Sequence, residues 1–540
     1  MLGWLIGGLV LALAVGGGFA AWRAVTDQQA PARAAAERAA SALLQRTLTD
    51  GAYGATAGPS DIDDLTATLR GMGTLRPVIT VEDVQLNEQQ QRGTARWRAD
   101  WTIHAGKPVW MQDAYLQLAR GSGGWTAVWS RDLIASGLET GDRLRAVRLA
   151  PTRGEILGAD DERLVWNQDA RRIGLDKTLV APERQAGSAR ALATAVGIDP
   201  DGYAAKVAAY GPKAFVEAAV VRAVGNDEWT ALSQARAIPG VRVIDAVRPL
   251  AISSTFARGL LGTVGEATGD IIKASGGSIR EGDLVGLGGL QKVRNAQLTG
   301  VTGFVVQAYP SDHVEAARDL FRVPSVPGES LRITLSQAQQ KRAEALIGPT
   351  GRRAIVAVRP SDGAVLALAS APGTSTAISQ RIYPDSFAPV AELARTRPDG
   401  LAGAVAALGL TGDADIGVPV FLSDTTGGTL RLSPYALAGA VASVARGASI
   451  RPNLFTEVEH PEVTDGLTAA EVTAVRTAMR AAVQRGPLKV LADLPRTKVL
   501  ADGDGKLWTV AVQGDLAVAV YDPDTLNSAG LMKRYLGRVA

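Results

Sequence analysis

The first 150 residues combine two helical segments with four segments in which hydrophobic and polar residues alternate. Residues 30–48 are rich in alanine with scattered charges, and residues 61–71 follow a turn at Gly58, so both segments predict helices. Alternation with a period of two is typical of half-buried antiparallel strands. It runs through residues 78–86, 93–103, 109–119 and 124–130. Helices followed by an antiparallel sheet predict an α+β cone.

Further along the chain the pattern predicts shorter strands and a final helix. Residues 153–165 predict a strand, a polar turn at residues 159–162 and a second strand. A linker is expected at residues 325–328, residues 507–521 predict a strand pair, and residues 528–536 predict the last helix. A chain of 540 residues holds roughly three domains at about 100–200 residues each.

Residues 2–22 contain no charged side chain and are long enough to cross about 30 Å of hydrocarbon. Trp4 and Trp22 stand where interfacial aromatic residues belong. The alternative is a cleaved signal peptide with a small-x-small site at residues 18–20, but the run is long and lacks a basic start. We therefore expect an uncleaved anchor. Arg23 follows the span and no Lys or Arg precedes it, so charge gives no support for its orientation.

Composition excludes several classes of function. The net charge is only +3, and no segment carries a block of Lys or Arg, so nucleic acid is not an expected partner. The chain has no cysteine, which removes disulfides, thiol catalysis and thiolate metal sites. His104, His313 and His460 are far apart, so no zinc site is expected. The glycines at residues 286–289 lack the Lys-Ser/Thr of a phosphate loop, so no nucleotide or other cofactor is expected.

Several motifs in the first 300 residues resemble penicillin-binding proteins. Residues 124–144 (GWTAVWSRDLIASGLETGDRL) resemble the end of the N-terminal domain of MecA-type members, which implies a nuclear-transport-factor-two-like (NTF2-like) cone acting as a spacer above the membrane. Residues 153–165 (RGEILGADDERLV) resemble the opening of the class B dimerisation, or pedestal, domain. Residues 258–265 (RGLLGTVG) and 282–300 (GDLVGLGGLQKVRNAQLTG) resemble later motifs of that domain, in the expected order.

The C-terminal part resembles the transpeptidase domain of the same family, a serine-enzyme (β-lactamase-like) α/β sandwich. The resemblance rests on residues 331–345 (LRITLSQAQQKRAEA), 354–370 (AIVAVRPSDGAVLALAS), 427–447 (GGTLRLSPYALAGAVASVARG) and 475–486 (VRTAMRAAVQRG). It implies a multidomain α+β protein with four segments. These are an anchor at 1–25, the NTF2-like domain at 26–145, the dimerisation domain at 146–324 and a transpeptidase-like domain at 325–540.

The three motifs that carry out acyl transfer in this family are absent from the whole chain. Such enzymes use S-x-x-K, S-x-N and K-T-G, in which the Lys one helical turn after the Ser accepts its proton. In residues 383–390 (YPDSFAPV), Ser386 takes the place of the nucleophile, but Pro389 takes that of the Lys and would strain a helix there. Lys498 survives from the third motif, without the Thr and Gly that follow it. Four other hydroxyl residues are alternatives to Ser386, none with a Lys three positions on: Thr374, Ser375, Thr376 and Ser379.

Only about twenty residues separate Ser386 from residues 408–417. The family places a helical subdomain with the S-x-N motif in this interval, so the subdomain is expected to be deleted. Ser386 and Lys498 are therefore expected to be vestigial, with Ser386 a helix-capping or turn residue. The resemblance implies a membrane-anchored, extracytoplasmic pseudoenzyme that acts as a scaffold or regulator in peptidoglycan assembly. Its expected partners are the membrane and cell-wall synthesis proteins, in a homo- or hetero-dimer. Two alternative functions remain open. One is an active D,D-transpeptidase that uses an atypical serine, and the other is a binding module for a wall fragment.

Overall fold

The computed structural model divides the chain into two compact units. Unit 1 comprises Met1–Pro151 and Val301–Val326, and unit 2 comprises Thr152–Gly300 and Pro327–Ala540. Both units mix helices with sheets, which confirms the predicted α+β class. The structure describes residues 28–46, 52–103, 106–223, 233–371, 379–384, 386–412, 414, 416, 420–457, 466–494 and 499–537.

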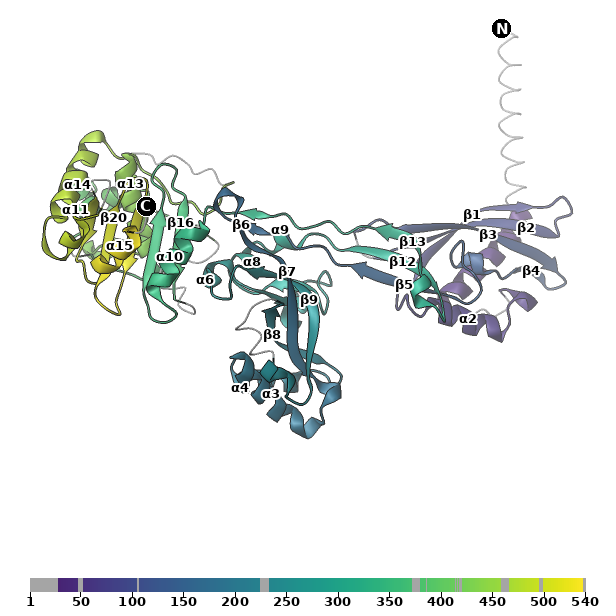
Figure 1. The fold of residues 1–540 in the computed structure, drawn as a ribbon. Coiled ribbons are helices and arrows are strands. Elements are labelled where there is room, and N and C mark those ends of the chain that lie inside the picture. Colours follow the sequence, from purple (N-terminus) through teal and green to yellow (C-terminus); the bar gives the residue numbers. More distant parts are fainter. Residues whose placement is uncertain are drawn as a thin grey trace, which may run out of the picture. The chain divides into compact units, whose positions relative to one another are not determined.

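A four-stranded antiparallel sheet, in the order β1-β2-β3-β4, forms one wall of unit 1 (Figure 1). Its inward-facing residues are buried against α2 and a helix over residues 28–45, and Trp97 and Trp110 lie in this core. The two helices and four strands predicted from the sequence are thus confirmed. The fourth strand is shorter than predicted because Ser130 caps a 3-10 helix, η2 (Arg131–Leu133). The other bounds are η1 Gly54–Thr56, α2 Pro59–Leu69, β1 Pro77–Leu86, β2 Arg92–Trp101, β3 Trp110–Gly121 and β4 Gly124–Ala127.

A second sheet in unit 1 joins segments that are far apart in the sequence. It has the order β13-β12-β5, formed by β5 (Asp142–Leu149), β12 (Gly303–Pro310) and β13 (Arg318–Val323). The pairing of Phe304 with Arg148 and of Ala308 with Leu144 brings the 301–326 segment back to the N-terminal unit. The four domain segments inferred from the sequence divide the chain differently and stay a prediction.

The first part of unit 2 is built on the long strand β7 (Arg163–Asp176). It pairs antiparallel with β8 (Phe215–Arg222) and along β9 (Val241–Ala251). The helices α3 (Pro182–Val196) and α4 (Pro200–Ala209) cover one end of this sheet, where Ile173, Leu192 and Tyr203 share a core. β7 also pairs with β6 (Ile156–Leu157) across η3 (Ala159–Asp161), which confirms the predicted strand, turn and strand.

Glycines allow short elements to pack closely beside this sheet. A Cβ atom on Gly262 would lie 1.8 Å from the carbonyl oxygen of Gly288, and one on Gly286 would lie 1.8 Å from that of Gln291. Only glycine fits at such approaches of backbone to backbone. The elements are α6 Arg258–Leu261, β10 Val264–Glu266, α7 Gly269–Ala274, β11 Leu284–Gly286, α8 Gly289–Val293 and α9 Asn295–Thr299.

The C-terminal part of unit 2 is a five-stranded antiparallel sheet in the order β16-β15-β21-β20-β19. Alternate residues of its strands face two separate cores: Val356 and Val510 lie in the core shared with α13, and Ile355 and Val518 in the core shared with α10 and α15. The predicted closing strand pair and last helix are confirmed. The bounds are α10 Gln337–Ile347, β15 Ala354–Val358, β16 Val365–Ser370, α11 Ala388–Ala394, α12 Gly400–Ala407, β17 Ser423–Asp424, β18 Arg431–Leu432, α13 Pro434–Arg446, α14 Ala469–Ala482, η8 Gly486–Leu491, β19 Leu500–Gly503, β20 Trp508–Val512, β21 Ala517–Tyr521 and α15 Ser528–Leu536.

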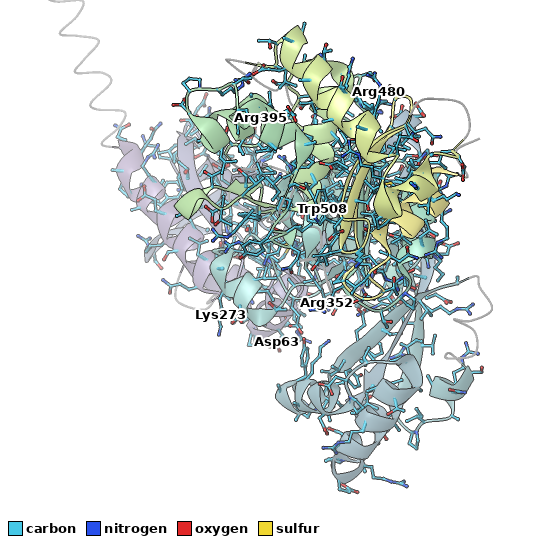
Figure 2. All side chains as sticks on the ribbon, turned by 90° about the vertical axis from the view of Figure 1, so that its left-hand side faces the viewer. Asp63, Lys273, Arg352, Arg395, Arg480 and Trp508 are labelled. Atoms are coloured by element: carbon cyan, nitrogen blue, oxygen red, sulfur yellow. The ribbon has the colours of Figure 1, made fainter. Side chains whose placement is uncertain are left out.

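Large side chains separate clearly into interior and surface in this part of the chain. Figure 2 labels Trp508, which is buried, together with Arg395 and Arg480, which are exposed. α13 is the most enclosed of the described helices, because every residue from Pro434 to Val444 is buried. The sheet therefore lies between α13 with its neighbours on one face and α10 with α15 on the other.

The two parts of unit 2 share one hydrophobic core. It runs from Leu260 and Leu290 through β14 (Leu331–Arg332) to the C-terminal sheet. Polar contacts reinforce it: the carboxylate of Glu344 on α10 accepts a hydrogen bond from the N–H of Ala257 at 2.6 Å. Burial raises the pKa of Glu344 above its usual value, and hydrogen bonds from Gln340 and Ala257 oppose the rise.

The predicted membrane span at residues 2–22 falls outside the described residues. Among the helices that the structure describes, none has the length and apolar character needed to cross a membrane.

A buried arginine in unit 2 is held by neutral groups. The Arg153 guanidinium donates to the side chains of Gln291 (2.8 Å), Asn295 (3.0 Å) and Thr299 (2.8 Å), and to the Gln291 carbonyl (2.9 Å). Burial lowers the pKa of Arg153 to about 10. The Nε2 donor of Gln291 is buried and has no hydrogen-bond partner. The site therefore contains a buried cation and an unsatisfied donor side by side, and both lower the free energy of unfolding.

We predict that Gln291→Glu stabilises the protein by about 1–2 kcal/mol, because it replaces the unsatisfied donor with a counter-ion for Arg153. The measurement is the midpoint of thermal unfolding, which should rise by a few degrees. Gln89→Glu makes the same charge change at an exposed turn residue and should leave the midpoint unchanged. A midpoint lowered by Gln291→Glu would contradict the prediction.

Candidate functional site

The candidate site lies where the start of α11 meets β19, the edge strand of the C-terminal sheet. Ser386 precedes α11 and its side chain is exposed. The next residue, Phe387, is buried and forms the helix N-cap without a side-chain hydrogen bond. Its ring meets the Trp508 ring edge to face, with centroids 5.8 Å apart. Phe387 thus fixes the start of α11 on the sheet and leaves Ser386 outside it. The cap of α11 is thus Phe387, and Ser386 lies immediately before it.

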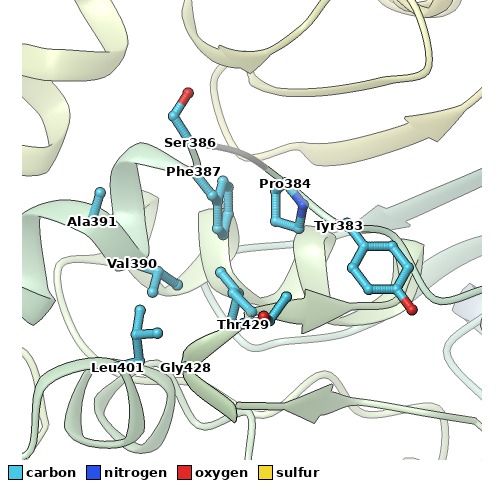
Figure 3. Close-up of a pocket in the computed structure, with 10 residues that line it drawn as sticks. Tyr383, Pro384, Ser386, Phe387, Val390, Ala391, Leu401, Gly428 and Thr429 are labelled. Carbon is cyan, nitrogen blue, oxygen red and sulfur yellow. The ribbon is translucent and has the colours of Figure 1, made fainter. Parts of the chain in front are cut away.

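Among the described residues that line the pocket beside Ser386, none is basic. The position three residues on is Pro389, which is buried in the first turn of α11. The expectation that this proline would strain a helix is wrong, because the first turn requires no intrahelical N–H from it. Figure 3 shows the Ser386 hydroxyl directed away from Val390 and Leu401. Among the described residues the pocket, of about 290 Å³, is lined by Tyr383, Pro384, Ser386, Phe387, Val390, Ala391, Leu401, Gly428, Thr429 and Leu430.

Asp502 of β19 caps α11 from outside the helix. Its Oδ2 accepts a hydrogen bond from the N–H of Ala388, the first residue of α11, at 2.6 Å. A carboxylate is well placed there, because the first N–H groups of a helix have no intrahelical acceptor and carry partial positive charge. Asp502 is only 8% exposed, and this burial raises the pKa of its carboxyl above the usual value, against the hydrogen bonds from Ala388 and Gly503.

β19 is covered along its length. Val499, Leu500 and Ala501 are all buried, as is Asp502, and α14 and η8 pack against the strand. In the family that the sequence resembles, this is the strand that lines the substrate site. Among the described residues, Leu500, Ala501 and Asp502 are buried under α14 and η8, which leaves an extended substrate little access to this part of the strand.

Of the other candidate residues, the structure describes Ser379. The Ser379 hydroxyl oxygen accepts a hydrogen bond from the N–H of Phe421 at 2.5 Å, so it holds two segments together. Lys498 lies outside the described residues, as do three of the alternatives to Ser386: Thr374, Ser375 and Thr376.

No metal site is found in the described part of the chain, where no three His, Cys, Asp or Glu side chains are arranged to hold an ion. His313 is exposed beside Asp312, at 3.2 Å. His104 and His460 lie outside the described residues.

A largely buried ion pair secures the short connection between α11 and α12. Arg397 donates two hydrogen bonds to the carboxylate of Glu471 at 2.8 and 2.9 Å, and the two side chains are 14% and 11% exposed. Glu471 also accepts from Thr468 in the capping box of α14. Burial alone would raise the pKa of Glu471, but the hydrogen bonds from Arg397 and Thr468 hold it below the usual value. No local pattern in the sequence indicates this pair, because its members are 74 positions apart.

Residues 148–333 match the family model of the Penicillin-binding Protein dimerisation domain. The match supports the resemblance to penicillin-binding proteins read from the motifs in this stretch, and a role like theirs in cell-wall synthesis. A search of curated proteins finds no match to this chain.

We predict that Asp502→Asn stabilises the protein at pH 8, because the amide oxygen still accepts from Ala388 while a buried charge is removed. A carboxyl with a raised folded-state pKa favours folding at low pH and loses that contribution as pH rises through the folded-state value. The gain in thermal midpoint over wild type should therefore shrink as pH falls toward the usual Asp value of about 3.9. Asp493→Asn, at a carboxylate that is 80% exposed, is the control. A gain independent of pH would contradict this account.

We predict that Arg397→Ala destabilises the protein by about 3 kcal/mol, because it leaves the Glu471 charge without its buried partner. Arg395→Ala is the matched control: the side chain pairs with Glu392 on the same helix but is 69% exposed, so its removal should cost less than about 1 kcal/mol. Denaturant unfolding measures both. Equal losses for the two variants would refute the role given to Arg397.

Proposed function

We propose that this protein is a membrane-anchored, penicillin-binding-protein-like component of peptidoglycan assembly that acts as a scaffold or regulator and does not catalyse acyl transfer. Residues 2–22 anchor it in the cytoplasmic membrane, and the remainder of the chain lies on the outer side. Its N-terminal domain is an NTF2-like spacer of the MecA type. The match of residues 148–333 to the dimerisation domain supports the cell-wall role.

The observation that carries the non-catalytic role is the closed junction between β19 and α11. A serine acyltransferase needs a nucleophile, a base within hydrogen-bond reach and a place for the substrate. Here the Asp502 carboxylate occupies the start of α11, Pro389 follows Ser386 in place of a base, and β19 is buried. Among the described residues, these contacts argue against a base beside Ser386 and against an open place for substrate along β19, and they support the proposal.

One observation favours an active transpeptidase instead. Ser386 is exposed and borders the pocket, so a substrate carbonyl can reach its hydroxyl. An activating group would then have to come from elsewhere in the chain, since the pocket residues supply none. The two functions differ in whether a β-lactam acylates the protein.

We predict that the full chain in detergent forms no covalent adduct with a fluorescent penicillin, because Ser386 has no base and β19 offers no open strand. A denaturing gel and intact mass measure the adduct, and an active penicillin-binding protein labelled in parallel shows that the reagent works. A labelled serine in this chain would overturn the proposal. Loss of that label in Ser386→Ala, with its retention in Ser379→Ala, would then assign the nucleophile.

A further inference from the structure

A short strand edge beside the pocket has an open backbone. Ile382 is buried and exchanges two hydrogen bonds with Leu432 of β18, at 2.8 and 3.0 Å. Because N–H and C=O groups alternate in direction along an extended chain, those of Arg381 and Tyr383 face away from β18. Within the described part of the chain, no backbone hydrogen bond reaches either residue. Among the described residues, the bridge from Ile382 to the small sheet β17-β18 therefore ends in an unpaired edge.

The side chains on this edge form an exposed aromatic and cationic rim. Tyr383 is 56% exposed and lies under the Arg431 guanidinium, 5.4 Å from the ring centroid. Arg431 is held in place by Asp424, at 2.5 Å. Arg381 lies over the ring of Phe421 at 4.9 Å, and no acidic side chain among the described residues pairs with it. Tyr and Arg are the residue types that most often dominate binding at protein interfaces.

The pocket next to Tyr383 has the size and lining for one apolar side chain. Its volume of about 290 Å³ lies below the range of roughly 300–1,000 Å³ typical of small-molecule and cofactor sites. Phe387, Val390 and Leu401 supply its apolar wall, and the hydroxyl groups of Ser386 and Thr429 also border it. The apolar wall suits an aliphatic or aromatic anchor, and the two hydroxyl groups can contact a polar neighbour of that anchor.

We propose that an extended acidic segment of a partner protein binds here as an added strand. Its backbone pairs with the free edge at Arg381 and Tyr383, one apolar side chain enters the pocket, and a neighbouring carboxylate contacts Arg381. Strand addition of this kind takes affinity from main-chain hydrogen bonds and specificity from the pocket. The inference rests on the proposed scaffold role and names the surface and the chemistry by which the scaffold holds its partner.

The test is selection of a phage-displayed random heptapeptide library on the full chain in detergent, followed by fluorescence anisotropy with the most enriched peptide. We expect enriched peptides to carry an apolar residue close to Asp or Glu. Ala391→Trp, which fills the pocket from an exposed position, and Arg381→Glu should each weaken binding by about tenfold. Ala402→Trp on α12 and Arg480→Glu on α14 are exposed matched controls that should bind like wild type.

No enrichment, enrichment of basic peptides, or binding that survives either site variant would overturn the proposal. Sedimentation velocity tests whether a second copy of this chain occupies the edge instead. If Ala391→Trp abolishes self-association and no peptide competes with it, the edge belongs to a second copy and the proposal fails. These outcomes test only the strand-addition proposal. The proposed non-catalytic function fails by a different result, a covalent penicillin adduct.

Discussion

The C-terminal sheet depends on one constraint: both of its outer strands must have their backbone groups covered, since an open strand edge invites pairing with other chains. β16 meets the constraint through α10 and its N-cap. The side-chain oxygen of Gln340 accepts a hydrogen bond from the N–H of Leu368 at 2.8 Å, and the N–H of Ser336 donates one to the carbonyl of Leu366 at 2.9 Å. β19 meets it by burial under α14 and η8, with Asp502 fastening α11 beside it. The burial of β19 under α14 and η8 stabilises the fold and also keeps an extended substrate away from this strand. Stability and the proposed loss of catalysis therefore arise from the same contacts.

Local patterns in the sequence were sufficient to predict many of the helices and strands. The last helix, Ser528–Leu536, and the strand pair before it were predicted because their periodicity and turns are contained in a short window. The candidate site was predicted only in part. The sequence motif singles out Ser386, which the structure shows beside a pocket, but it does not indicate the role of Asp502, since 114 positions separate Asp502 from Ala388. The effect of Pro389 was misjudged because it depends on where the helix begins, which Phe387 decides by packing on Trp508.

Strand partners were the main structural feature that sequence patterns did not indicate. Alternation predicts a strand and its buried face, but it says nothing about which strand lies alongside. The return of Val301–Val326 to pair with β5 is therefore visible only in the structure. The Arg397–Glu471 pair illustrates the same limit for side chains, because two charged residues far apart in the sequence look like solvated surface until the fold brings them together.

The continuous core of unit 2 has a consequence for the order in which the chain becomes able to fold. A ribosome completes residues 152–300 before it makes the strands of the C-terminal sheet, yet Leu260 and Leu290 belong to the same core as those strands. Until residues 331–521 have been synthesised, these side chains lack their cover, and exposed apolar surface of this kind is the usual target of chaperones and proteases. Within the stretch that matches the dimerisation domain, the core around Ile173, Leu192 and Tyr203 can therefore form first, while the part around Leu260 and Leu290 is covered only after the C-terminal sheet has been made.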